Sequence, residues 1–303
     1  MSQIIFAAIF VGDANECAKS PSDQSKKMIK HSIINSIRAN YVAQKKHYGS
    51  MVLACDNGSW RNDIFSQYKY SRREKRKQDN SGIKWNFVNE VKNELVDDLN
   101  DKFPFVVINL PKTEGDDIGA VLSKHITDNS SLESELDIFG DSTVENILIQ
   151  SSDADNYQLH MLGKHIKQWS PMLKKMVGPV GSARNALIEK IVKGDSGDGI
   201  PNIKMDSNTF VDKIRQKPIS QKYLDSFYTS SNPIEMCEDE EQRINYIRNE
   251  QLISYEKIPL HISEAIILCY NQQLVKKHSK MSLMNYFINN DMTNLLGQIH
   301  DFY

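Results

Sequence analysis

Acidic side chains follow three short apolar runs in the first two-thirds of the sequence. The runs span residues 51–55, 105–110 and 147–150, and a fourth acidic group follows a helical pattern over 185–193. The acidic residues of interest are, in chain order, Asp56, Glu114, Asp116, Asp153, Asp155, Asp195 and Asp198. Because the carboxyl ends of parallel strands lie at one edge of a sheet, we expect these side chains to converge.

Several unpaired carboxylates can share a small site only if cations neutralise them. Oxygen ligands at this density favour Mg²⁺, with Mn²⁺ as the alternative, and two such ions can activate water for phosphodiester cleavage. His160 and His165 are expected to be ordinary polar residues, since oxygen ligands suffice. A single Asp at a strand end is more often a helix cap, and Asp117 fits such a first-turn acid. Four clusters in order along the chain favour the metal site.

A basic segment lies between the first two apolar runs. Residues 68–77 carry six basic side chains and one acidic side chain, together with Tyr68 and Tyr70. Lys and Arg neutralise phosphates and tyrosine rings can stack on unpaired bases, so the segment predicts a nucleic-acid contact. A solvated helix face is the alternative interpretation.

A second candidate for phosphate binding lies at residues 194–203. Small residues surround the two aspartates of this stretch, and Ile-Pro-Asn-Ile follows them. The pattern predicts a tight helix–turn–helix whose backbone amides bind phosphate without reading bases. A plain turn is equally consistent with these residues.

The elements that must position these residues alternate along the chain. Apolar side chains recur every four positions from Ile29 to Tyr41, which predicts a helix that ends before Gly49. The three apolar runs predict buried strands, and helical patterns lie between them. The expected fold class is α/β, a mostly parallel central sheet with helices on both faces. From about residue 202 onward the apolar spacing predicts a helical half.

Composition and charge narrow the class of protein. The chain is 40% hydrophobic, which excludes a disordered or collagen-like protein. Its four cysteines form no CxxC pair, which argues against structural zinc. The longest apolar run, Ile4–Val11, is too short to span a bilayer. The net charge of −2 is interpreted as the sum of an acidic metal site and a basic segment.

These motifs together resemble the structure-specific 5′-nuclease family, which includes flap endonucleases and the 5′-nuclease domains of bacterial polymerases. The segments that carry the resemblance are Val52–Asn57, Trp60–Arg61, Glu114–Asp117, Ser151–Asp155 and Lys193–Asp198. His31–Ile37 and Lys167–Met172 are similar to its phage branch, the ribonucleases H of T-even bacteriophages. The resemblance implies a PIN-like core over 1–180, with a basic arch at about 60–82, and a helical DNA-binding region over 181–303.

The resemblance also implies roles for single residues. The first metal ion would be held by Asp56, Asp116 and Asp153, with Glu114 bonding through water. The second site would be formed by Asp155, Asp195 and Asp198. The arch through which a 5′ single strand passes would contain Tyr68, Lys69, Arg72, Arg73 and Arg76. A helix–turn–helix-type hairpin with K⁺ would grip the duplex through Gly197, Gly199 and Ile200.

The implied activity is 5′→3′ removal of RNA primers and adjacent DNA from lagging-strand fragments, together with cleavage at flap junctions. The implied substrates are DNA and RNA–DNA duplexes with 5′ ends or flaps. The implied setting is a phage-encoded monomer in the host cytoplasm that does not bind membranes. A single-strand DNA-binding protein and a sliding clamp are the implied partners. Ile299–Tyr303 is the candidate clamp contact, with a plain helix end as the alternative.

The amino terminus departs from the family pattern. Family members begin with a central strand that ends in a metal-binding Asp, whereas Met1–Ile4 matches the segment after that strand. Either the leading strand is absent, or Ile4–Val11 is that strand and Asp13 is the ligand. We favour the first, because it keeps the family spacing of about fifty residues to Asp56. A missing strand leaves buried backbone groups unpaired, so the alternative function is a catalytically weakened, branched-DNA-binding paralogue.

Overall fold

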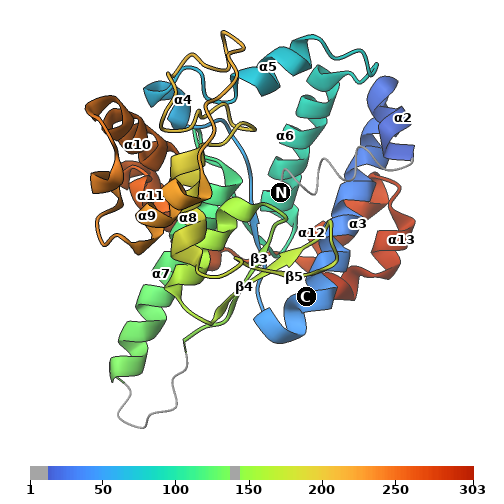
Figure 1. Cartoon of the computed structure of the whole chain (residues 1–303). Coiled ribbons are helices and arrows are strands. Elements are labelled where there is room, and N and C mark those ends of the chain that lie inside the picture. The colour runs from blue at the N-terminus through green and yellow to red at the C-terminus, as the bar shows by residue number, and fades with distance from the viewer. Residues whose placement is uncertain (1–12, 137–143) are drawn as a thin grey trace. The chain divides into compact units, whose positions relative to one another are not determined.

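The computed structural model describes residues 13–136 and 144–303, and it has a mixed α/β structure (Figure 1). Contacts within the chain divide it into two units. Unit 1 comprises residues 1–58, 80–118 and 264–303, and unit 2 comprises residues 59–79 and 119–263. This division differs from the boundary expected at residue 180, because the C-terminal helices return to pack within unit 1.

Unit 1 contains two parallel strands, β1 (Val52–Ala54) and β2 (Val106–Ile108), which are paired along their whole length. Its helices are α2 (Asp13–Lys19), α3 (Asp23–Tyr48), α6 (Trp85–Lys102), α12 (Lys280–Asn289), α13 (Thr293–Gly297) and the short 3₁₀ helix η4 (Ile299–Phe302). The first two expected strands and the helix expected between Ile29 and Tyr41 are therefore confirmed.

Local sequence explains the limits of α3. The hydroxyl of Ser22 accepts a hydrogen bond from the amide of Ser25 at 3.0 Å and caps the start of the helix. Gly49 ends it with a φ of 67°, a conformation that glycine adopts without strain. Between these ends, Ile29, Ile33 and Ile37 are buried on one face.

The core of unit 1 includes an aromatic cluster formed by the C-terminus. The ring of Phe302 lies 5.5 Å from that of Phe103, and Phe302 is 1% exposed. Ile299 is also buried in this cluster. Ile299–Tyr303 therefore forms a helix end whose main apolar side chains pack in the core. The clamp contact stays a prediction.

Unit 2 contains a three-stranded sheet. In it β3 (Ile147–Gln150) runs parallel to β4 (Ile166–Ser170), which is antiparallel to β5 (Lys175–Val177). Its helices are α4 (Arg61–Ile64), α5 (Tyr70–Lys77), η1 (Ala154–Leu162), α8 (Ala183–Lys193), α9 (Gln221–Thr229), η2 (Pro233–Met236), α10 (Glu240–Ile253) and η3 (Tyr255–Lys257). Two longer helices, α7 (Gly115–Leu136) and α11 (Leu260–Leu274), have residues in both units.

The mixed α/β class, the parallel strand pairs and the helical C-terminal half are confirmed. The expected single sheet is not what the described residues form, because β3 pairs with β4 and not with β1 or β2. The candidate first strand, Ile4–Val11, lies outside the described residues. Asp13 is the first residue of α2. None of the described helices is long and apolar enough to cross a membrane.

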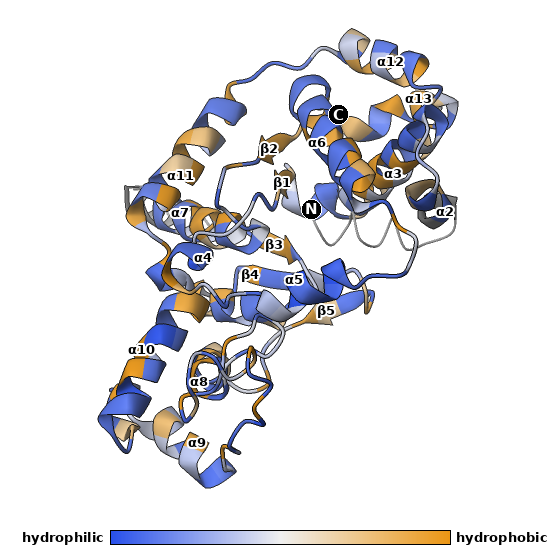
Figure 2. Ribbon diagram, turned by 90° about the horizontal axis from the view of Figure 1, so that it is seen from above, coloured by the Kyte–Doolittle hydropathy of each residue, from blue (hydrophilic) through white to orange (hydrophobic). Residues whose placement is uncertain are grey.

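Two elements were missed at the sequence level although their sequences carry signals. In α6, Val88, Val91, Leu95 and Leu99 are buried at helical spacing. In β4, side chains alternate between buried and less buried positions, as expected for a strand with one covered face. Figure 2 shows the short strands as hydrophobic and α5 as hydrophilic, in agreement with the basic composition of residues 68–77.

Candidate functional site

In unit 1 the end of β1 is fixed to the start of α7. The carboxylate of Asp56 accepts a hydrogen bond from the amide of Gly115 at 2.6 Å. The amide of Asn57 donates to the carbonyl of Thr113 at 2.9 Å.

Little space for a side chain remains at position 115. A Cβ there would lie 3.1 Å from Asp56 Oδ1 and 3.3 Å from the carbonyl oxygen of Ala54. Glu114 and Asp116 flank this glycine and, like Asp56, are only partly buried. The sequence prediction that these three carboxylates belong together is consistent with this arrangement within unit 1.

Asp117 has a different role from its neighbours. Its side chain is fully buried, and Oδ2 accepts a hydrogen bond from the amide of Glu114 at 3.2 Å. This is the bond of a helix-capping acid, as the sequence had suggested for this one aspartate.

In unit 2, Asp153 begins the 3₁₀ helix that follows β3. Its Oδ1 accepts a hydrogen bond from the amide of Asp155 at 3.0 Å. The side chain of Gln168, which is 1% exposed, donates to the carbonyls of Ser151 at 2.9 Å and Asp153 at 2.8 Å. Gln168 of β4 therefore holds this acidic turn in place, a role that the sequence did not reveal.

The next carboxylates of unit 2 are bridged by a lysine. The ammonium of Lys190, in the last turn of α8, forms ion pairs with Asp155 Oδ1 and with Asp195 Oδ2, the latter at 2.9 Å. Burial alone would raise the pKa of Asp195. The ammonium of Lys190 and the amides of Asp198 and Gly197 outweigh that effect, so this pKa lies below its ordinary value. Lys190 was also missed at the sequence level.

Directly after α8 the chain makes a tight turn. Asp195 and Ile200 exchange two backbone hydrogen bonds, at 2.8 and 2.7 Å. Gly194 has a φ of 68°, and a Cβ there would collide with the carbonyl of Ile200. The next α-helix begins only at Gln221. Of the two interpretations of this stretch, the plain turn describes the residues that follow α8.

Asp198 joins this turn to the basic segment. The hydroxyl of Tyr68 donates to Asp198 Oδ2 at 2.9 Å, and Arg72 pairs with Oδ1 at 2.9 Å. The amide of Lys69 donates to the carbonyl of Asp198 at 2.7 Å. Burial raises the pKa of Asp198 above its ordinary value, although Lys69 and Arg72 act in the opposite direction.

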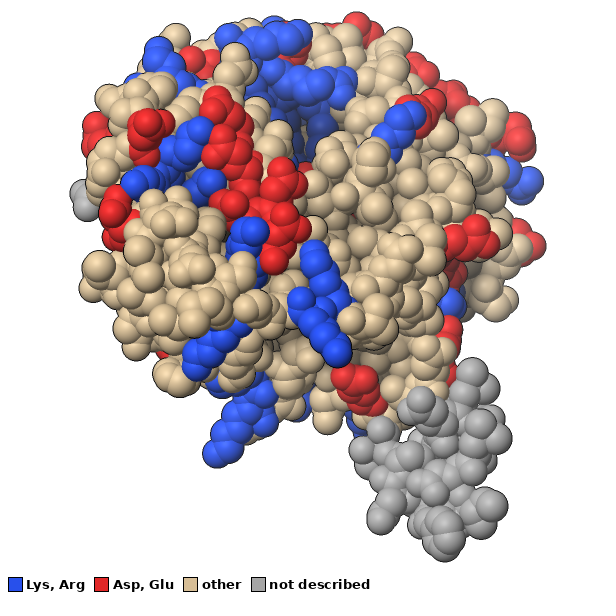
Figure 3. Space-filling model, turned by 180° about the vertical axis from the view of Figure 1, so that it is seen from behind, with Lys and Arg blue, Asp and Glu red and all other residues tan. Residues whose placement is uncertain are grey.

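The basic segment is ordered as a helix, α5, in this structure. Tyr68 is 3% exposed and packs in the core of unit 2, so its ring faces other side chains here, and the expected stacking on bases stays a prediction. Arg73 donates to the carbonyls of Tyr68 at 2.6 Å and Ser66 at 2.7 Å, which fixes the segment itself. Arg72 and Arg76 are exposed. Figure 3 shows Lys and Arg side chains gathered in several patches on one face.

The three turn residues expected to contact a duplex differ in exposure: Gly197 is exposed, whereas Gly199 and Ile200 are buried. Gly197 is exposed, and a Cβ there would lie 3.4 Å from the guanidinium of Arg72. Gly199 has a φ of 75° and is buried against the carbonyl of Gln67. Ile200 is 2% exposed in the core of unit 2, and both its backbone groups bond to Asp195. In this structure Ile200 contributes to the core, and its expected duplex contact stays a prediction.

Within the part of the chain that the structure describes, no three His, Cys, Asp or Glu side chains are grouped closely enough to hold a metal ion. The expected ligands are divided, with Asp56, Glu114 and Asp116 in unit 1 and the other four in unit 2. Carboxylate oxygens are the type of ligand that Mg²⁺ or Mn²⁺ prefers. The Asp155–Asp195 pair, moreover, already accommodates one cation, the ammonium of Lys190.

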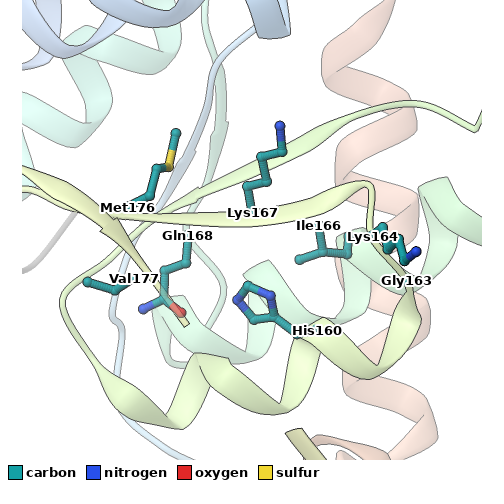
Figure 4. A pocket seen from close by; sticks show the side chains of 8 residues that line it. All are labelled: His160, Gly163, Lys164, Ile166, Lys167, Gln168, Met176 and Val177. Atoms are coloured by element: carbon teal, nitrogen blue, oxygen red, sulfur yellow. The ribbon is translucent and has the colours of Figure 1, made fainter. Parts of the chain in front are cut away.

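The histidines near Asp153 behave as polar residues of the fold. His165 Nε2 lies 2.8 Å from the hydroxyl of Thr127. His160 lines a cavity of about 600 Å³, and burial lowers the pKa of its imidazole. Figure 4 shows the side chains of His160 and Gln168 on one side of β4, with Lys167 and Met176 pointing to the other.

Two comparisons of the sequence with known proteins lead to the same family. Residues 181–302 match the family model described as T4 RNase H, C terminal. The chain is 31% identical over 283 residues to the ribonuclease H of Enterobacteria phage T4, which covers 91% of this chain and 87% of that protein.

Solved structures share the fold at lower identity. A bacteriophage T5 protein crystallised with metal ions is 16% identical, with a TM-score of 0.54 over 82% of this chain and 93% of that chain. The T5 5′-exonuclease with bound zinc is 14% identical, with a TM-score of 0.52 over 90% of this chain and 96% of that chain. The T5 flap endonuclease in a complex with DNA and metal ions is 14% identical, with a TM-score of 0.50 over 79% and 89%.

Proposed function

This chain belongs to the T4 ribonuclease H family, and we propose that it is a metal-dependent 5′→3′ exonuclease and flap endonuclease. It removes RNA primers and adjacent DNA from lagging-strand fragments in the infected host cell. The observation that carries this proposal is the 31% identity to the T4 ribonuclease H across 91% of the chain. The solved phage nucleases that share the fold support it, since their structures contain metal ions, zinc in one case, and DNA in another.

Two Mg²⁺ ions, with Mn²⁺ as a substitute, supply an activated water and a stabilised leaving oxygen when bound. In unit 1, Asp56 and Asp116 would contribute metal ligands, and Glu114 would bond through water. In unit 2, Asp153 would be a further metal ligand. Asp155, Asp195 and Asp198 shape the second site.

The basic segment positions the nucleic acid. Lys69, Arg72 and Arg76 neutralise backbone phosphates, and these contacts carry no sequence preference. Arg73 acts indirectly, because its guanidinium holds the carbonyls of Tyr68 and Ser66. The amides of the turn at Gly197 approach the duplex, with K⁺ as the monovalent ion of this turn.

The test is cleavage of a 5′-flap substrate and of an RNA–DNA duplex in Mg²⁺. Asp153→Asn and Asp155→Asn are expected to lower the cleavage rate by about 10²-fold or more, because each removes a metal ligand. DNA binding, followed by fluorescence anisotropy, is expected to remain. Asp212→Asn is the matched control, because Asp212 is an exposed carboxylate of unit 2 outside the acidic groups.

The outcomes separate two functions. If both Asn variants cleave at the rate of Asp212→Asn, the acidic cluster is not the catalytic centre. If the unaltered chain binds flap DNA but cleaves nothing in Mg²⁺ or Mn²⁺, the branched-DNA-binding alternative replaces the nuclease.

A further inference from the structure

The ammonium of Lys190 lies between two carboxylates of the proposed second metal site. It pairs with Asp155 on one side and, at 2.9 Å, with Asp195 on the other. The side chains of all three residues are between 22% and 28% exposed, so the cluster is partly shielded from water. Shielding of this degree makes charge interactions stronger than on an open surface.

Packing of helix α8 places Lys190 beside Asp155 and Asp195. Ile188, Ile191 and Val192 are buried and fix the orientation of α8 in the core of unit 2. The helix ends at Lys193, so Asp195 follows within two residues of its last turn. Helix α8 packs against η1, which carries Asp155. The lysine and both carboxylates therefore come from elements that are fixed within one unit.

Asp155 and Asp195 share Lys190 as their counter-ion. Without it, the two negative charges would repel each other. A lysine ammonium is a compact charge on a flexible stem, so it can neutralise the pair and can also swing away. A divalent ion at the same pair would need the oxygen atoms that Lys190 now contacts.

We propose that Lys190 is a built-in counter-ion of the second metal site. It holds Asp155 and Asp195 in place in the metal-free protein, and a divalent ion must displace it in order to bind. Lys190 therefore sets the affinity of the second ion and leaves that of the first nearly unchanged. This inference rests on the proposed function, because it assumes that both carboxylates are metal ligands.

The experiment measures Mn²⁺ binding by the full-length, metal-free chain, using calorimetry and electron paramagnetic resonance of the free ion. Lys190→Gln is expected to bind the second Mn²⁺ about tenfold more tightly, because a competing cation is gone. The first Mn²⁺ is expected to change less than about twofold. Lys190→Arg keeps the charge and is expected to stay near the unaltered chain.

Lys193→Gln is the matched control. It removes the same charge from the same helix end, but Lys193 pairs with Glu189 at 2.5 Å rather than with either aspartate. It is expected to leave both Mn²⁺ affinities within about twofold of the unaltered chain.

Thermal melting adds a readout that does not depend on activity. In Mn²⁺-free buffer Lys190→Gln is expected to melt below Lys193→Gln, because two carboxylates lose their counter-ion. Saturating Mn²⁺ is expected to raise its melting temperature by more than that of the control.

The results distinguish the two hypotheses. If Lys190→Gln binds the second Mn²⁺ no more tightly than Lys193→Gln, the counter-ion role is refuted while the nuclease proposal stands. An equal gain in both variants would show a general field effect and also refutes it. If the unaltered chain and Lys190→Gln both fail to bind a second Mn²⁺, the proposed second site is wrong, and the counter-ion inference falls with it.

Discussion

The two halves of the acidic set are stabilised by different kinds of group. In unit 1, Asp56 is held by the backbone amide of Gly115 at the start of α7. In unit 2, Lys190 pairs with Asp155 and Asp195, and Arg72 pairs with Asp198, in addition to the amide of Asp198 that donates to Asp195 Oδ1 at 3.1 Å. A backbone amide cannot leave when a metal ion binds, whereas a lysine or arginine side chain can.

This difference suggests that the carboxylates of the two units respond differently to a bound metal ion. Unit 1 offers oxygen atoms whose positions are set by the main chain, and so by the fold itself. Unit 2 also offers oxygen atoms, on Asp155 and Asp195, that contact the side chain of Lys190, which a divalent ion can replace. We therefore expect changes in unit 1 to disturb folding and activity together, and changes in unit 2 to separate them.

The largest expected effect concerns Gly115. In Gly115→Ala the new methyl group meets Asp56 Oδ1 and the carbonyl of Ala54. Overpacking of this kind costs about 1–3 kcal/mol, and displacement of Asp56 is expected to reduce cleavage as well. Urea denaturation and flap cleavage measure both effects.

Gly119→Ala provides the control on the same helix. A Cβ at Gly119 meets nothing within 4 Å, so this variant is expected to be neutral or more stable by up to about 1 kcal/mol. If the two variants were equally stable and equally active, Asp56 would not be held by the backbone amide of Gly115.

An intermediate effect is expected from Gln168, which tests whether the Asp153 turn depends on a side chain. Gln168→Leu leaves the carbonyls of Ser151 and Asp153 without this donor, a loss of about 1–3 kcal/mol. The midpoint of urea unfolding measures it. Lys167→Ala, an exposed neighbour on β4, is expected to change stability by less than about 0.5 kcal/mol. A Gln168→Leu protein as stable as this control would show that the turn is fixed by other contacts.

The smallest expected effect is a difference in stability between variants of two neighbouring arginines, Arg72 and Arg73. Arg73→Ala removes two bonds to backbone carbonyls and is expected to cost about 1 kcal/mol of stability. Arg72→Ala is expected to cost less, because a partly exposed ion pair contributes little. If Arg72 binds a phosphate, its loss lowers the slope of log K against log salt by about 0.9. Unchanged slopes for Arg72→Ala would remove it from the DNA contact.

Several features of the fold were predictable because they depend on local sequence. Apolar side chains at four-residue spacing gave the helix through Ile29 and Ile33, and short apolar runs gave β1, β2 and β3. The partition of strands into sheets was not predictable in this way. Which strands pair depends on contacts between distant segments, and so β3 pairs with β4, a strand that the sequence pattern did not reveal.

The sequence by itself determined the family, the order of the acidic clusters and the basic composition of residues 68–77, because these are properties of residue type and spacing. Only the tertiary structure decided how the charges are paired. It buries Tyr68 and Ile200, which sequence had placed at the nucleic acid, and it brings Lys190 to Asp155 and Asp195. The physical reason is that a charged side chain takes the partner that packing puts within reach, and packing joins segments far apart in the chain.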